Sequence, residues 1–151
     1  MTAGCAHPTR AAALVTAGLL LTGCVTPATG RDSYSDKAVT SVRAASSEVQ
    51  TARLVLRLLS RHRILSPYAD ETLTADEEAV GSISATFGSV QPPRGDDELR
   101  DAVATLLSDA EDAVGHARIA ARRSDPDGAG DAAEELREVA KDLARAEERL
   151  S

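Results

Sequence analysis

Few side chains in this sequence are suited to nucleophilic or metal chemistry. The cysteines are Cys5 and Cys24, and the histidines beyond position 24 are His62 and His116. A cysteine thiolate is a strong nucleophile, so a cysteine in a defined context is the first candidate for chemistry. Cys24 has such a context, because it follows an apolar run at positions 11–21 that is too short to span a bilayer as a helix.

The residues directly before this cysteine complete a recognisable motif. The segment Leu21-Thr22-Gly23-Cys24 resembles the lipobox of bacterial lipoproteins, in which an aliphatic residue, a small residue and Gly or Ala precede a cysteine. The resemblance implies that the Cys24 thiol receives a diacylglyceryl group through a thioether and that a signal peptidase cuts after Gly23. The alternative is that Cys24 is an ordinary thiol of a secreted protein that is cut elsewhere.

The segment before the motif has the layout of a secretory signal peptide. Arg10 supplies the positive charge and positions 11–21 the apolar region. We therefore expect residues 1–23 to be removed and residues 24–33 to form the lipidated cysteine with a flexible tether. The expected location is the extracytoplasmic face of the cell membrane, with the covalent lipid as the only attached group and no other cofactor.

Net charge narrows the choice of partners. Loss of residues 1–23 removes Arg10 and no acidic side chain, so the formal net charge changes from −7 to −8. An acidic domain repels the phosphates of nucleic acids and of anionic lipids. We therefore expect no nucleic-acid partner, and membrane attachment through the lipid anchor alone.

After the tether, apolar residues recur in alternating steps of four and three, which predicts helices with one apolar face each. The predicted helices cover residues 34–65, 67–90, 96–123 and 130–150, with Pro- or Gly-containing breaks between them. Short connections make each helix run opposite to the one before. The sequence therefore predicts an all-α fold, an antiparallel up-down-up-down four-helix bundle over residues 34–151.

Each predicted helix has an identifiable buried face. Asp76 is the one polar residue on the face of the second helix, although a capping box at Thr74 offers a later start that would place Asp76 in the first turn. The first face is predicted to be Ala38, Val42, Ala45, Val49, Ala52, Leu56 and Leu59, and the third face to be Leu99, Val103, Leu106, Ala110, Ala113, Ala117 and Ala120. Four further apolar residues lie beside the predicted faces and either widen the core or form a surface patch: Leu54, Val55, Leu58 and Leu107.

Arginines gather near the predicted C-termini of the first and third helices, which share one end of such a bundle. One interpretation is that these charges complement the helix dipoles and pair with nearby acids. The other is an anion or partner site at the end turned away from the membrane. The candidate residues for that site are Arg57, Arg61, Arg63, Arg118, Arg122 and Arg123.

No other pattern indicates catalysis. His116 follows Asp112 by one helical turn, and such a pair could bind a metal or move a proton. No further ligand accompanies it, so we expect His116 to be an imidazole at the surface or at the edge of the buried face. The chain has no Glu-x-x-His motif of the kind that di-iron bundles use, and we expect no metal site. Its layout is similar to that of small helical lipoproteins of high-GC Gram-positive bacteria with no assigned activity.

Two functional hypotheses follow from these observations. The first is a non-enzymatic, lipid-anchored interaction or structural module that engages an envelope protein. The alternative is a bundle that binds a small molecule or ion, or catalyses a reaction, with its site at the arginine-rich end or near His116.

Overall fold

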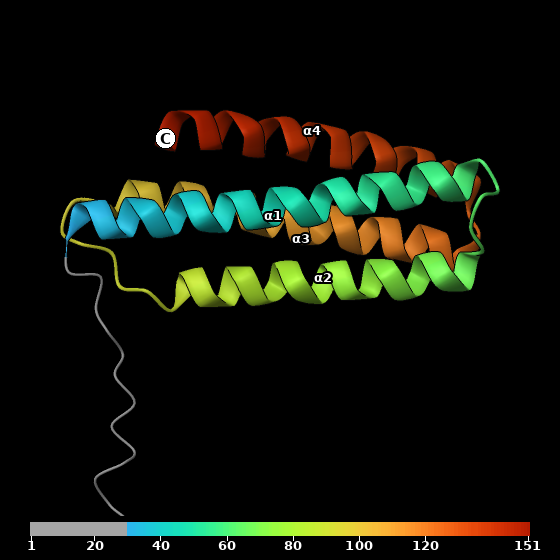
Figure 1. Ribbon diagram of the computed structural model, residues 1–151, viewed down its shortest axis with the longest axis horizontal. Coiled ribbons are helices and arrows are strands. Elements are labelled where there is room, and N and C mark those ends of the chain that lie inside the picture. Colours follow the sequence, from blue (N-terminus) through green and yellow to red (C-terminus); the bar gives the residue numbers. More distant parts are fainter. Residues whose placement is uncertain (1–29) are drawn as a thin grey trace, which may run out of the picture.

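The computed structural model describes residues 30–151, which form four α-helices joined by short connections (Figure 1). The helices are α1 (Arg31–Ser60), α2 (Ser66–Gly88), α3 (Asp97–Arg123) and α4 (Pro126–Leu150). This part of the chain contains no strand, which confirms the prediction of an all-α fold. The predicted signal peptide, Cys24 and the tether as far as position 29 lie outside the described residues.

The four helices form a bundle in which two helices are central. α1 and α3 each contact the other three helices, whereas α2 and α4 do not contact one another. Figure 1 shows the helices side by side, with the α1–α2 and α3–α4 connections at one end and the α2–α3 connection at the other. None of the described helices is both long enough and apolar enough to cross a bilayer.

Alanine, valine and leucine fill the core. The predicted face of α1 is buried from Ala38 through Leu56, and Val55 joins it. Many of the completely buried positions are alanines, which let the helix axes approach closely but bury little area per residue. The largest fully buried side chains are Tyr34, Phe87, Leu73, Leu107, Leu136 and Leu143.

α1 begins earlier than predicted. Its first residue is Arg31, so residues 31–33, expected in the tether, are helical. Two contacts hold this start in place. The Tyr34 ring is completely buried with its centroid 5.6 Å from that of Phe87, and Arg31 Nε lies 3.0 Å from Asp96 Oδ1. The sequence pattern missed these contacts because they join residues far apart in the chain.

α1 also ends earlier, at Ser60 and not at the predicted position 65. His62 adopts a left-handed backbone conformation with φ of 52°, its N–H donates to the Leu59 carbonyl, and the Arg63 N–H donates to the Leu58 carbonyl. This is the Schellman pattern, which stops a helix and usually has glycine at the left-handed position. Because histidine occupies this position, the sequence pattern contains no stop signal at the end of α1.

α2 and α3 differ little from prediction. α2 starts at Ser66, which supports the earlier of the two starts considered, and ends at Gly88, not 90. α3 starts at Asp97, with Asp96 as its cap residue.

α4 begins at Pro126, not at position 130. Asp125 caps it, since its Oδ1 accepts the Gly128 N–H at 3.0 Å, and Pro126 occupies the first turn, where its missing N–H costs nothing. Residues 126–129, among them Gly128, are therefore helical and do not belong to the predicted turn. Gly128 suits this cap, because a Cβ there would lie 2.6 Å from Asp125 Oδ2.

The buried face of α3 is wider than predicted. Leu107 is completely buried and Leu106, predicted as a core residue, is only half-buried. Val114 and Ala121 are buried beside the predicted Ala113 and Ala120. The reason is that α3 packs against three helices, so a single seam cannot cover its contacts.

Candidate functional site

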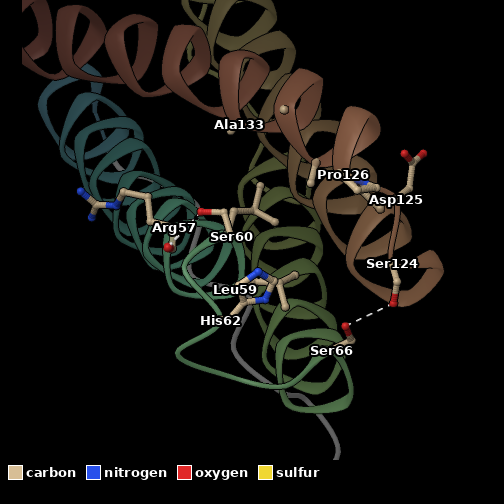
Figure 2. A pocket seen from close by; sticks show the side chains of 13 residues that line it. Arg57, Leu59, Ser60, His62, Ser66, Ser124, Asp125, Pro126 and Ala133 are labelled. Atoms are coloured by element: carbon tan, nitrogen blue, oxygen red, sulfur yellow. Dashed lines mark hydrogen bonds between the residues drawn. The ribbon is translucent and has the colours of Figure 1, made fainter.

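The clearest candidate site is a pocket of about 570 Å³ where the ends of three helices meet, hereafter the end pocket (Figure 2). α1 contributes Leu56, Arg57, Leu59 and Ser60, and α3 contributes Ala120. The remaining lining residues belong to the two connections and to the first turns of α2 and α4: His62, Ser66, Ser124, Asp125, Pro126, Ala129, Gly130 and Ala133.

Both connections at this end have the same local structure. Ser124 has φ of 50°, its N–H donates to the Ala121 carbonyl, and the Asp125 N–H donates to the Ala120 carbonyl, so α3 ends as α1 does. Among the described residues, His62 and Ser124 are the only non-glycine residues with positive φ, and both line the end pocket. Across the pocket floor, Ser124 Oγ lies 3.3 Å from Ser66 Oγ, which ties the two connections together.

The predicted arginine cluster divides in this structure. Arg57 lines the end pocket, and Arg61, Arg63, Arg122 and Arg123 are exposed in the connections or last turns beside it. None of these five side chains forms an ion pair with another described residue. The proposed pairing with the acids at the starts of α2 and α4 is therefore not made.

Arg118 does not belong to this group. It is partly buried between α3 and α2, where its Nε bonds Glu77 Oε2 and its Nη2 lies 3.4 Å from Glu77 Oε1. Hydrogen bonding to Glu77 raises the pKa of the Arg118 guanidinium. This side chain is a bridge between two helices and is not a free cation at the end of the bundle.

His116 is an exposed imidazole whose hydrogen-bond partner is Glu135 and not Asp112. Its Nδ1 lies 2.8 Å from Glu135 Oε2 of α4, and this hydrogen bond, with the charges of Glu135 and then Asp112, raises the pKa of the imidazole. The pair is exposed and lines neither of the two pockets described here. It acts as a surface link between α3 and α4.

A buried carboxyl group of α2, Asp76, lies beside the partly buried Glu48 of α1. Asp76, predicted as the polar exception on its face, is 5% exposed, and its Oδ2 has no hydrogen-bond partner among the described residues. Burial, followed by the charge of Glu48 and a hydrogen bond with it, raises the pKa of Asp76 to about 6. Below about pH 6, a protonated Asp76 can therefore donate to Glu48.

A shallow groove of about 440 Å³ lies between α2 and α3, lined by Thr74, Glu77, Glu78, Gly81, Glu111 and Arg118. In this groove, a glutamate from each helix lies against a glycine of the other helix. Glu111 of α3 lies over Gly81, where a Cβ would meet its Oε1 at 3.3 Å, and Glu77 of α2 lies over Gly115 at the same distance. The two helices thus exchange equivalent contacts.

This reciprocal arrangement was missed at the level of sequence, although a signal for it exists. The segments Glu77-Glu78-Ala79-Val80-Gly81 and Glu111-Asp112-Ala113-Val114-Gly115 are nearly identical. Leu73 and Leu107, four residues before each glutamate, are both completely buried. A search for short internal repeats would have found the pair and placed the two glycines opposite the two glutamates.

Within the described residues, no group of three or more His, Cys, Asp or Glu side chains is arranged to hold a metal ion. Comparison with known proteins adds no relative: no family model, curated protein or solved structure matches the chain.

Proposed function

We propose that this chain is a bacterial lipoprotein, held at the extracytoplasmic face of the cell membrane by a diacylglyceryl group on Cys24, with an antiparallel up-down-up-down helical bundle behind the anchor. The lipobox at positions 21–24 carries this proposal, together with the signal-peptide layout before it. The acidic bundle supports it, because a domain of this charge needs a covalent anchor to stay at an anionic membrane.

Because α1 begins at Arg31, the linker between Cys24 and the bundle is short. Only residues 25–30 separate Cys24 from the first helical residue, Arg31. At 3.3–3.6 Å per residue, such a linker reaches roughly 20 Å when fully extended. The bundle therefore stays close to the lipid surface, and α1, with 30 residues, extends about 45 Å from its start to the end pocket.

The activity we propose is non-enzymatic binding of an envelope partner by the end of the bundle that carries the end pocket. The supporting observation is a pair of exposed apolar side chains at that end: Leu65, which is 78% exposed, and Tyr68, which is 64% exposed. Large apolar side chains exposed together mark contact surfaces. Unpaired Arg61 and Arg63 flank them and favour an acidic partner surface.

Two experiments test the two parts of this proposal. Cys24→Ser should abolish incorporation of labelled fatty acid and release the protein from the membrane, whereas Cys5→Ser, in the segment that is removed, should change neither. For the partner, photo-cross-linking from position 68 in intact cells should capture one protein in stoichiometric yield. Cross-linking from position 54, where Leu54 is 47% exposed on the side of α1, is the matched control. Equal capture from both positions would contradict a contact at the pocket end.

A second candidate function, binding of a small molecule, is supported by the end pocket itself. Its volume of about 570 Å³ lies within the range of roughly 300–1,000 Å³ typical of ligand sites. Catalysis near His116 has no comparable support, because that side chain is exposed and lies outside this pocket.

A further inference from the structure

We propose that the end pocket binds a single-chain amphiphile that carries an anionic head group. This inference deepens the second candidate function by naming the class of ligand. It rests on the shape and chemistry of the pocket and on two unusual backbone conformations in its wall.

The inner walls are apolar and come from three helices. Leu56 and Leu59 of α1 face Ala120 of α3 and Ala129 and Ala133 of α4. Small residues on α4, including Gly130, leave the space that larger side chains would fill. An apolar chain placed there gains the hydrophobic free energy of its own burial and of the exposed part of Leu59 that it covers.

Several polar groups lie where the two connections border the pocket. Figure 2 shows His62, Ser66 and Ser124 in this region, with Ser60 and Arg57 on the side of α1 and Asp125 beside Pro126. The hydroxyl groups of Ser66 and Ser124 bond each other and can turn to donate to a ligand oxygen. Asp125 also lines the pocket, but its Oδ1 accepts the Gly128 N–H and caps α4.

Positive charge at the mouth selects an anionic head group. Arg57 lines the pocket with an exposed guanidinium that forms no ion pair within residues 30–151. Figure 2 shows this guanidinium extended outward from α1, away from His62, Ser66 and Ser124, so a head group that it binds remains in water beside α1. Arg61 and Arg122 add unpaired positive charge at the same end. A guanidinium binds carboxylates and phosphates through paired, charge-assisted hydrogen bonds.

The backbone supplies an independent argument. Glycine would satisfy the left-handed positions at 62 and 124 without strain, yet this chain places a histidine and a serine there. Both side chains line the pocket. Strained conformations of this kind persist mainly where the side chain serves a site. The side chains of His62 and Ser124 are therefore assigned to ligand binding.

Photo-labelling in native membranes tests the inference on the full-length, lipidated protein. The probes are decanoate and decyl phosphate with a diazirine near the chain end, and the matching decanol as a neutral analogue. Labelling by the two anions should be saturable and should map to residues 56–62 and 120–133. Decanol should label the same residues more weakly, by about tenfold if the Arg57 contact is worth ~1.4 kcal/mol.

Two variants with matched controls sharpen the test. Ala133→Trp should fill the pocket and abolish labelling, whereas Ala104→Trp, on the exposed side of α3, should not. Arg57→Gln should weaken labelling by the anions and leave decanol unchanged, whereas Arg53→Gln, one turn earlier, should affect neither. Circular dichroism establishes that each variant keeps its helical content.

Three outcomes would overturn the inference: labelling spread evenly over all four helices, labelling insensitive to Ala133→Trp in a folded variant, or equal labelling by decanol and decanoate. The result is distinguishable from failure of the anchoring proposal. Pocket labelling with no lipid on Cys24 would overturn the anchor alone, and a lipidated Cys24 with no pocket labelling would overturn the amphiphile site alone.

Discussion

The carboxyl group of Asp76 on α2 is buried beside that of the partly buried Glu48 on α1. Asp76 is almost completely buried, one of its oxygens has no partner among the described residues, and its pKa is raised to about 6. Glu48 is the charged residue that perturbs it, and no basic side chain compensates the pair. The charge state of this pair therefore affects the stability of the whole bundle.

The pH dependence follows from the direction of this shift. The folded protein binds a proton on Asp76 more tightly than the unfolded chain, whose aspartates have a pKa near 3.8. The stabilisation from this proton is complete at pH values below the pKa of Asp76 in the unfolded chain, and it is lost as the pH rises through about 6. The difference of about two between the folded and unfolded pKa values of Asp76 corresponds to at most roughly 3 kcal/mol in the free energy of unfolding.

Asp76→Asn should remove this dependence. The amide stays neutral and can still donate to Glu48, so we expect the variant to be more stable than wild type at pH 8 by about 1–3 kcal/mol and no more stable at pH 4. Urea unfolding across this pH range measures the effect. Glu78→Gln, on the exposed side of α2, is the control and should keep the wild-type slope. An unchanged slope in Asp76→Asn would show that the carboxyl pair does not titrate in this range.

The reciprocal glutamate–glycine contacts predict unequal effects of two similar substitutions. Gly81→Ala brings a Cβ within 3.3 Å of Glu111 Oε1, the free end of a flexible side chain that can move aside. Alanine is worth up to about 1 kcal/mol over glycine in a helix interior, so Gly81→Ala should be stabilising. Gly115→Ala presses on Glu77, which Arg118 holds in place, and should be neutral or destabilising.

Thermal unfolding of the two variants gives the comparison, and Gly130→Ala serves as the reference because a Cβ there meets nothing within 4 Å. Adding Arg118→Gln should release Glu77 and make Gly115→Ala resemble Gly81→Ala. Equal effects of the two alanines in the presence of Arg118 would argue against a fixed Glu77.

The wide contact face of α3 can be tested with adjacent leucines. Leu107 is completely buried and Leu106 is half-buried, so Leu107→Ala should cost about 2–5 kcal/mol and Leu106→Ala clearly less. Denaturant unfolding measures both. If Leu106→Ala lowers the free energy of unfolding more than Leu107→Ala does, the buried face of α3 is the single row of residues that the sequence pattern predicts.

His62→Gly should reveal the cost of the strained connection. Glycine adopts a positive φ without penalty, so the variant should be more stable by about 1 kcal/mol. Arg63→Gly, at the next position, lacks this advantage and is the control. If His62→Gly is destabilising by differential scanning calorimetry, the imidazole contributes more to folding than its backbone conformation costs.

Sequence patterns predicted four helices and the buried face of α1 because both depend on local periodicity. They failed where the decisive contact joins distant residues, as for His116 with Glu135, or where an uncommon residue fills a standard role, as His62 does at the end of α1. Periodicity left open whether Leu107 widens the core or forms a surface patch, because it assumes one partner for each helix, whereas α3 has three and buries Leu107 completely. The end pocket depends on three helix ends at once, and no local pattern describes it.

The most direct test of the central proposal is the intact mass and N-terminal analysis of the protein extracted from membranes of its native host. The account predicts a mature chain that begins at Cys24 and carries the mass of a diacylglyceryl group on that residue, with or without a further acyl chain. A chain without lipid, or one that begins at any other residue, would contradict it.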